Sequence, residues 1–188
     1  MKNVAAIVLA AGRSRRFGSP KQLVKIEGRS LVRRAVDAAL SAGCHPTVAV
    51  LGARAEEVAA ELTGTGADLV VNARWEEGMA SSIRAGIGRL RETAPSAAAV
   101  IVLLADQPHV SESLLRSLAE RLGLQSAAAC RYEGVLGPPA IFSATLFDRL
   151  EALTGDEGAR CLLRSGDLSV AAIDFPAGAL DIDAPGDP

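Results

Sequence analysis

The chain reads VAAIVLAAGRSRRFGSPK over residues 4–21, and this stretch decides how the rest is interpreted. Val4–Ala10 is an unbroken apolar run, which predicts a strand buried on both faces of a parallel sheet. Small residues, a serine, three arginines and Lys21 follow it. Small residues let the backbone approach a ligand, and N–H groups and cations then face the same anion. At the carboxyl end of a first parallel strand, this composition indicates a loop that binds a nucleotide phosphate.

The overall composition is typical of one globular domain. The chain has 188 residues, of which 49% are hydrophobic and 22% charged, enough for one sizeable core. Aromatic residues make up only 3%, which argues against a stacking platform for single-stranded nucleic acid. We therefore expect a single domain over residues 1–188.

Charge is distributed unevenly, although the net charge is only -2. Residues 1–34 contain nine lysines and arginines and one acid, Glu27. From Gly166 to the end there are five aspartates and no basic residue. This distribution suits a site that binds phosphates near the basic N-terminal segment and a metal ion near the acidic C-terminal segment. The alternative is that these charges are simply solvated surface. Because the remainder of the chain is acidic, no nucleic-acid partner is expected.

The cysteines and the apolar runs bear on where the protein resides. Cys44, Cys130 and Cys161 have no C-x-x-C spacing, and three cysteines cannot pair completely, which favours a reducing compartment. We interpret them as small apolar fillers. The longest apolar runs, Val4–Ala11 and Ala97–Ala105, are too short to cross a membrane, and the N-terminus lacks a signal-peptide pattern. A cytoplasmic protein without a membrane partner is expected.

Apolar runs alternate with segments of helical periodicity along the first two thirds of the chain. The predicted strands are Val4–Ala10, Thr47–Leu51, Leu69–Asn72 and Ala98–Leu104. Apolar residues at helical spacing fall between and after them, namely Leu31, Val32, Ala35, Val36 and Leu40, then Val58 and Leu62, then Ile83, Ile87 and Leu90, then Leu114, Leu118 and Leu122. This alternation predicts an α/β fold with a mostly parallel sheet and helices on both of its faces.

The alternation of strand-like and helix-like segments becomes less regular after about residue 124. Ala127–Tyr132 and Ala140–Phe142 are predicted as short strands separated by a loop over residues 133–139, and Ser169–Ile173 as a further strand. Ser143–Leu153 and Gly158–Arg164 are predicted to be helical. The same domain therefore has an elaborated second half over residues 126–188.

Asp106 directly follows the predicted strand Ala98–Leu104, within ADQP at residues 105–108. A carboxylate at the end of a central strand is well placed to bind Mg²⁺, because a hard cation prefers oxygen ligands and a triphosphate supplies the others. The alternative is that Asp106 caps the next helix. Ser111, with Glu112 in the first turn, is the better cap, which leaves Asp106 for the metal.

Two other segments carry polar groups. NARWEEGMASSI at residues 72–83 precedes a predicted helix, and Ser81 and Ser82 are expected to cap its N-terminus, where N–H groups attract oxygen ligands. Trp75 is interpreted as a core residue rather than one that stacks on a base. Near the C-terminus, Asp181 and Asp183 are two residues apart and would point to the same side of an extended segment, unless this is a frayed acidic tail.

The first loop contains neither G-x-G-x-x-G nor a Walker pattern ending in G-K-[ST]. From Leu9 to Lys21 it reads L-A-A-G-x-S-x-R-F-G-x-x-K, which resembles the signature of the nucleotidyltransferase family that includes the molybdenum cofactor cytidylyl- and guanylyltransferases. The resemblance covers nearly the full chain and implies a single Rossmann-like nucleotidyltransferase domain. Four details resemble the cytidylyltransferase branch of this family. They are A-A-G in place of A-G-G, and the motifs K-Q-L, G-M-A-S-S and T-G-D-E-G-A-R.

The resemblance implies how the donor nucleotide is bound, with residues 1–125 forming mainly the nucleotide half. The floor of the triphosphate site would consist of Leu9, Ala10, Ala11 and Gly12. Arg16 and Lys21 would contact the β- and γ-phosphates or the leaving pyrophosphate, and with Asp106 they are the implied catalytic residues. Arg13 and Arg15 fall at variable positions of the motif. The base and ribose side would be lined by Gly78, Met79 and Ser82.

The resemblance also implies the metal and acceptor sites. L-A-D-Q-P and D-I-D-A-P resemble the metal-binding motifs of the family, so Asp106 and Asp183 would hold Mg²⁺, or alternatively Mn²⁺. G-x-P-x-x-F and G-D-x-G-A-R resemble its acceptor-side motifs. They imply an acceptor site in residues 126–188, formed by Gly137, Pro138, Gly158 and Arg160; turn chemistry with a surface arginine is the alternative.

The implied reaction is transfer of CMP from CTP to the phosphate of molybdenum-loaded molybdopterin, which gives molybdopterin cytosine dinucleotide and pyrophosphate, with GTP as the alternative donor. A product of this kind implies a handover partner, either a molybdoenzyme or a maturation chaperone. Two alternatives remain open. One is a cytidylyl-, uridylyl- or guanylyltransferase acting on a sugar or polyol phosphate, and the other is a non-catalytic module that binds a nucleotide or cofactor.

Overall fold

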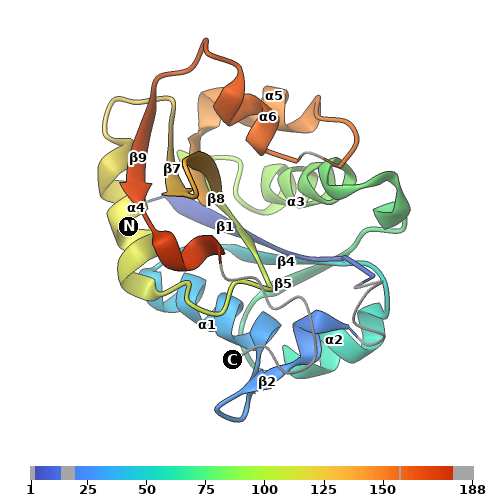
Figure 1. Ribbon diagram of the computed structural model, residues 1–188. Helices are drawn as coiled ribbons and strands as arrows, with labels where there is room; N and C mark the ends of the chain where they lie inside the picture. Colours follow the sequence, from blue (N-terminus) through green and yellow to red (C-terminus); the bar gives the residue numbers. More distant parts are fainter. Residues whose placement is uncertain (1–2, 14–19, 157, 180–188) are drawn as a thin grey trace.

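The first strand of the chain, β1 (Val4–Ala10), lies in the middle of a seven-stranded sheet (Figure 1). The computed structural model describes residues 3–13, 20–156 and 158–179. Every residue of β1 is buried, as expected for a strand covered on both faces. β1 pairs in parallel with β4 (Thr47–Leu51) on one side and with β6 (Ala99–Leu104) on the other.

The sheet is mostly parallel, and its strand order is β5-β4-β1-β6-β8-β7-β9. The outer strands are β5 (Asp68–Val71), β7 (Ala127–Tyr132), β8 (Val135–Ser143) and β9 (Val170–Asp174). Only β8 runs against its neighbours, because it pairs in antiparallel fashion with both β6 and β7. A separate small hairpin is formed by β2 (Lys25–Ile26) and β3 (Arg29–Ser30).

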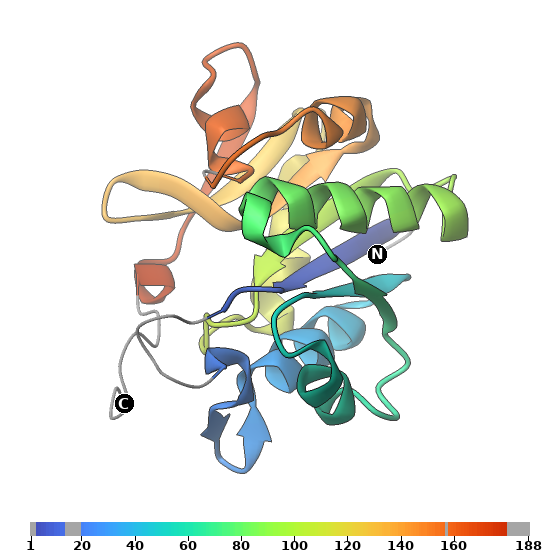
Figure 2. The same cartoon turned by 90° about the vertical axis from the view of Figure 1, so that its right-hand side faces the viewer.

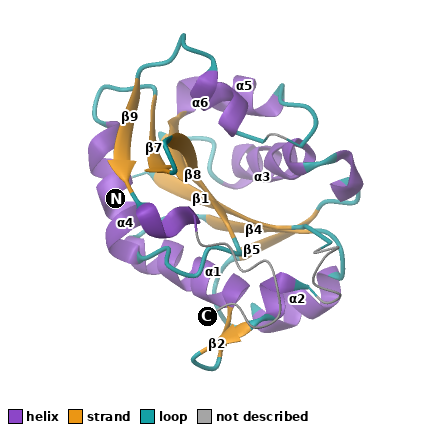
Figure 3. Cartoon of the chain, in the orientation of Figure 1, coloured by secondary structure: helices purple, strands orange, loops and turns teal. Residues whose placement is uncertain are grey.

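Helices cover both faces of the sheet, as the sequence predicts (Figures 1 and 3). One face is covered by α1 (Leu31–Ala42), α2 (Ala55–Glu61) and α4 (Glu112–Leu122). The other is covered by α3 (Met79–Thr93), α5 (Phe147–Glu151) and α6 (Arg160–Arg164). Four short 3₁₀ turns complete the chain, namely η1 (Lys21–Leu23), η2 (Trp75–Glu77), η3 (Ala144–Leu146) and η4 (Pro176–Ala179).

The predicted core helices are present, with small shifts in which residues they bury. α1 buries Ala39 more fully than Leu40, and α4 buries Leu115 and Leu118 rather than Leu114. Ser111 caps α4, because the N–H of Leu114 donates a hydrogen bond to its Oγ at 3.3 Å. None of the described helices is long and apolar enough to cross a membrane.

The second half differs from the prediction in three places. β8 begins at Val135, so most of the predicted loop over residues 133–139 is strand. The prolines fit because the β7–β8 register shifts at Ala129/Cys130, and Pro138 and Pro139 fall in that irregularity, where no ladder N–H is required. The helix predicted over 143–153 is divided into η3 and α5, and the one predicted from Gly158 begins at Arg160.

The strand order creates a cleft at one edge of the sheet. The chain leaves β1 toward β4 on one side and returns through β6 on the other, so the connections diverge at the carboxyl ends of β1 and β6. Ligands of open α/β sheets bind at such a switch point. Figure 2 shows that the β7–β8 hairpin and η4 project from this same end of the sheet.

Candidate functional site

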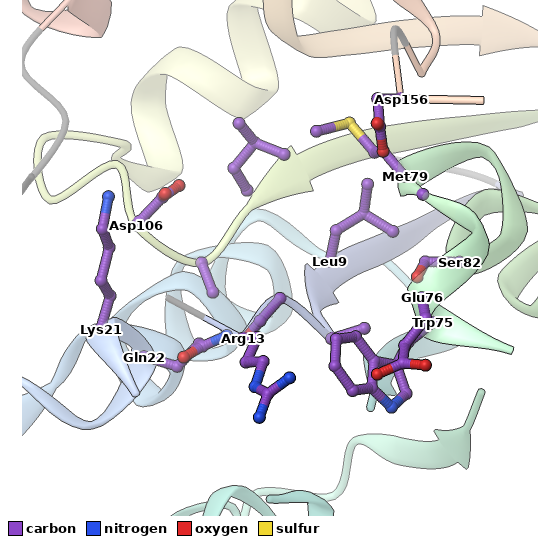
Figure 4. Close-up of a pocket in the computed structure, with 15 residues that line it drawn as sticks. Leu9, Arg13, Lys21, Gln22, Trp75, Glu76, Met79, Ser82, Asp106 and Asp156 are labelled. Carbon is purple, nitrogen blue, oxygen red and sulfur yellow. Dashed lines mark hydrogen bonds between the residues drawn. The ribbon is translucent and has the colours of Figure 1, made fainter. Parts of the chain in front are cut away.

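The larger chamber of the cleft has a volume of about 570 Å³ and lies between the loop after β1, the end of β6 and the start of α3 (Figure 4). Nearly all described residues that the sequence assigned to the nucleotide line it, namely Leu9, Ala11, Gly12, Lys21, Gly78, Met79 and Ser82, and so does the predicted metal ligand Asp106. Ala10 is buried behind them and does not line the chamber. Arg16 lies outside the described residues.

A glutamine that the sequence analysis did not single out holds the start of the first loop. Gln22, in η1, is 5% exposed, and its Nε2 donates hydrogen bonds to the carbonyl oxygens of Ala10 at 3.1 Å and Gly12 at 2.8 Å. These bonds tie the end of β1 to the turn that carries Lys21. Gln22 therefore fixes the backbone at the start of the first loop.

The residue that follows β4 approaches the first loop so closely that only glycine fits there. A Cβ on Gly52 would lie 2.7 Å from the carbonyl oxygen of Ala11 and 2.7 Å from Cβ of Trp75. The N–H of Ala53 also donates a hydrogen bond to that Ala11 oxygen at 3.1 Å. Trp75 is half-buried and lines the chamber, so its interpretation as a core residue was wrong in this respect.

The start of α3 is organised differently from the prediction. Gly78 is the N-cap, so Ser81 and Ser82 lie inside the first turn and do not cap the helix. Both hydroxyls instead accept hydrogen bonds from Nδ2 of buried Asn72, at 2.7 Å and 3.1 Å respectively. Since Ser81 also donates to the carbonyl oxygen of Gly78, Asn72 and Ser81 position the glycine that faces the chamber.

Asp106 lies at the end of β6, is partly buried, and lines both chambers of the cleft. Lys21 lines the larger chamber with it (Figure 4). The described part of the chain contains no cluster of three His, Cys, Asp or Glu side chains that would hold a metal alone. A carboxylate beside a phosphate site nevertheless fits a hard divalent cation that takes its other ligands from phosphate oxygens and water. Asp183, the second predicted ligand, lies outside the described residues.

The smaller chamber, of about 330 Å³, continues the cleft toward β8 and α6. Of the residues that the sequence assigned to the acceptor, Pro138 and Arg160 line it, whereas Gly137 and Gly158 do not. Five residues line both chambers, namely Leu9, Met79, Leu104, Asp106 and Asp156. The two chambers therefore form one continuous cleft with Asp106 where they meet.

The two glycines of the acceptor motifs serve packing. A Cβ on Gly137 would collide with the hydroxyl of Tyr132 and lie 3.2 Å from Nε of Arg160. A Cβ on Gly158 would lie 2.5 Å from Sδ of Met79. Gly158 also has a φ of 57°, a backbone conformation that favours glycine. Both glycines thus let residues that line the cleft approach one another.

Arg160 is held by Tyr132 at the end of β7. Its guanidinium donates a hydrogen bond to the Tyr132 hydroxyl at 3.0 Å and lies 5.9 Å from the centre of the ring. Tyr132 is itself 6% exposed. The sequence offered one signal for this contact, because Tyr132 is the only tyrosine in the chain and precedes a turn of two residues.

The loop before α6 is fastened to the start of α3. The N–H of Ala80 donates a hydrogen bond to the carbonyl oxygen of Gly155 at 3.1 Å, and Arg84 donates to that of Leu153 at 2.6 Å. Asp156, in the same loop, lines both chambers and was not assigned a role from sequence. Only its place inside T-G-D-E-G-A-R could have indicated it.

The cysteines take no evident part in this chemistry. Burial raises the pKa of the Cys44 and Cys130 thiols to about 12, so both stay protonated near neutral pH and are poor nucleophiles. The interpretation as apolar fillers agrees with the complete burial of Cys44 and Cys130, whereas Cys161 is only partly buried and its Sγ donates a hydrogen bond to the carbonyl oxygen of Gly158 at 3.1 Å.

Comparison with known proteins places this geometry in context. The sequence matches the MobA-like NTP transferase domain over residues 6–170. It is 33% identical over 176 residues to the purine catabolism protein PucB of Bacillus subtilis, a match covering 89% of this chain and 83% of PucB. It is 36% identical over 182 residues to nicotine blue oxidoreductase of Paenarthrobacter nicotinovorans, covering 91% and 86% of the two chains.

A solved structure resembles this one over almost its whole length. Rv0371C of Mycobacterium tuberculosis, crystallised in complex with manganese, superimposes with a TM-score of 0.79 at 31% sequence identity. The match covers 99% of this chain and 92% of that one. The fold therefore occurs in a relative that was crystallised with a divalent metal.

Proposed function

This chain belongs to the MobA-like NTP transferase family and is a nucleotidyltransferase, and we propose that it transfers CMP from CTP to the phosphate of molybdenum-loaded molybdopterin. The observation that supports this most strongly is one cleft with two chambers that share Asp106. A transfer between two substrates requires that both reach one point. The cytidylyl branch rests on the A-A-G, K-Q-L and G-M-A-S-S motifs.

In this proposal the larger chamber holds CTP. Ala11, Gly12 and Lys21 face its triphosphate, and Gly78, Met79 and Ser82 face the base and ribose. Arg16, which lies outside the described residues, would join Lys21 in neutralising the charge of the leaving pyrophosphate. Residues 1–125 thus form mainly the nucleotide half and residues 126–188 mainly the acceptor half.

The proposed reaction is an in-line displacement at the α-phosphorus of CTP. An oxygen of the acceptor phosphate forms the new P–O bond, and the bond to the β-phosphate oxygen breaks, so pyrophosphate leaves. Because the nucleophile is already an anion, no residue needs to remove a proton. The chain contributes orientation of the two substrates and cations at the developing charge.

A divalent cation, Mg²⁺ or Mn²⁺, fits the carboxylate of Asp106, with Asp183 as the proposed second ligand. When bound, such an ion supplies charge neutralisation at the phosphates. The relative crystallised with manganese supports a divalent metal without deciding between the two ions. Asp106 would therefore hold the cation where the chambers meet, and Lys21 would neutralise phosphate charge beside it.

A pyrophosphate-release assay tests the proposal. The protein is incubated with Mg²⁺, molybdenum-loaded molybdopterin and either CTP or GTP. We expect release with CTP and formation of molybdopterin cytosine dinucleotide. Turnover only with GTP would assign the other nucleotide, and turnover only with a sugar or polyol phosphate would refute the acceptor. The absence of release with every acceptor would favour a non-catalytic binding module.

The name of one relative refers to oxidation and reduction rather than to group transfer. The pyrophosphate assay, run beside an absorbance assay with a redox substrate, distinguishes the two classes, because an oxidoreductase would change that absorbance without consuming CTP. A product that carries molybdenum also requires a recipient, so we propose handover to a molybdoenzyme or to a maturation chaperone.

A further inference from the structure

The arginines of this chain divide into two groups. Most described arginines form an ion pair with an aspartate or glutamate. Four form none with the carboxylates of the described residues: Arg13, Arg121, Arg160 and Arg164. Three of these four line the cleft: Arg13 lines the larger chamber, and Arg160 and Arg164 line the smaller one. A cation without an internal counter-charge beside a cavity is available to an anionic ligand.

Arg160 and Arg164 belong together. They are the first and last residues of α6, one helical turn apart, so their side chains emerge on the same side of the helix. Both line the smaller chamber, and neither lines the larger one. Tyr132 fixes the direction of the Arg160 guanidinium by its hydrogen bond of 3.0 Å.

This pair does not lie where the transferred group must lie. A phosphate that attacks CTP has to reach the region common to both chambers, which includes Leu9 and Asp106. Arg160 and Arg164 line the smaller chamber and are not among the residues common to both. The wall of the smaller chamber also includes the apolar side chains of Ile83, Val102 and Leu163.

We propose that Arg160 and Arg164 form a second anion subsite, which binds an anionic group of the acceptor other than its reacting phosphate. The acceptor is then a molecule with anionic groups at both ends and a less polar body that packs on the apolar wall. A sugar phosphate with a single phosphate lacks the second group. Tyr132 is the positioning residue of the subsite. This inference rests on the proposed function, because it assumes that the smaller chamber binds the acceptor.

A binding experiment tests the subsite without turnover. The Nε–Hε signals of the arginine side chains are followed by NMR while inorganic sulfate is added to the protein saturated with a non-hydrolysable CTP analogue. We expect the Arg160 and Arg164 signals to shift together with one saturable dissociation constant. Arg121, the unpaired arginine that lines neither chamber, is the internal reference. Shifts no larger than that of Arg121 would overturn the proposal.

Variants then connect the subsite to the acceptor. Arg160→Gln and Arg164→Ala should each raise the KM for molybdenum-loaded molybdopterin about tenfold, because a charge-assisted hydrogen bond is lost, and leave the KM for CTP unchanged. Tyr132→Phe should raise the acceptor KM about threefold with kcat and the melting temperature unchanged. Arg121→Ala is the matched control. Equal effects on the KM for CTP, or none on the acceptor, would contradict the assignment.

The two kinds of failure can be separated. If the wild-type protein does not use molybdopterin but sulfate still shifts the two arginine signals, the acceptor in the proposed function is wrong and the subsite stands. If molybdopterin is turned over and Arg164→Ala has a normal acceptor KM, the proposed function stands and the subsite is wrong.

Discussion

The two chambers of the cleft are built from different parts of the chain. The residues that bound the larger one include the small residues Ala11, Gly12 and Gly78, where the main chain comes within reach of a ligand. The smaller one is bounded by side chains from α3, β8 and α6, such as Ile83 and Arg160. A wall of backbone is fixed by the fold, whereas a wall of side chains can change without moving the sheet. The larger chamber should therefore be less tolerant of substitution than the smaller one.

The largest effect is expected where the chambers meet. Asp106→Ala and Lys21→Ala should each lower kcat for pyrophosphate release at least about a hundredfold, on the order of 2.7 kcal/mol of transition-state stabilisation. Asp167→Ala is the matched control, since this exposed aspartate is paired with Arg149 and neither residue lines the cleft. Near-normal kcat in a folded Asp106 or Lys21 variant would remove these residues from the reaction.

A second variant tests whether the backbone wall is rigid. Gly78 has a φ of 103°, and a Cβ there would lie 2.7 Å from the carbonyl oxygen of Gly155. Gly78→Ala should lower the free energy of unfolding by about 1–3 kcal/mol and kcat/KM for CTP about tenfold. Denaturant titration and steady-state kinetics measure the two effects.

Gly64→Ala separates backbone strain from collision. Gly64 has a φ of 75°, but a Cβ there would meet nothing within 4 Å. This control should lose stability without losing activity. If both glycine variants have normal kcat/KM for CTP, the larger chamber is not constrained by its backbone and the contrast between the chambers fails.

The third prediction concerns the residue that holds the first loop. Gln22→Leu removes the hydrogen bonds to the carbonyl oxygens of Ala10 and Gly12, which should cost about 1–3 kcal/mol. We expect the KM for CTP to rise about fivefold to tenfold while the acceptor KM stays constant. Gln125→Leu, at an exposed position, is the control. An unchanged KM for CTP would show that the loop keeps its shape without this side chain.

The smallest effect is expected away from both chambers. Ser111→Ala removes the N-cap of α4 and should lower stability by about 1 kcal/mol, with a fall in melting temperature of about 2–4 °C. Catalytic rates should not change, because α4 covers the sheet without lining either chamber. A change in the KM for CTP or acceptor would mean that the sheet transmits strain to the cleft, which would weaken the contrast.

The larger chamber was the more predictable of the two. The run Val4–Ala10, the small residues after it and Asp106 after β6 are all local patterns, and parallel topology alone brings their strand ends together. Gln22 was missed because a buried glutamine and an exposed one look alike in sequence. Its role arises only when η1 folds back onto Ala10 and Gly12.

The smaller chamber depends on contacts between segments far apart in sequence. Tyr132 meets Arg160 across 28 residues, and the loop at Gly155 meets α3 across 75. No periodicity or motif spacing encodes such a meeting. The extent of β8 was missed for a related reason, because Pro138 and Pro139 usually interrupt a strand and are accommodated here by a shifted register with β7.

The reversed direction of β8 has a consequence for how the molecule can diversify. Because β8 runs against β6, the turn that joins β7 to β8 at Glu133 and Gly134 lies at the ligand end of the sheet and projects beyond it (Figure 2). Residues added in pairs at this turn would lengthen the hairpin without altering the strand register beneath. Descendants of one ancestral chain could thus acquire taller or shorter walls over the smaller chamber while inheriting the same first loop.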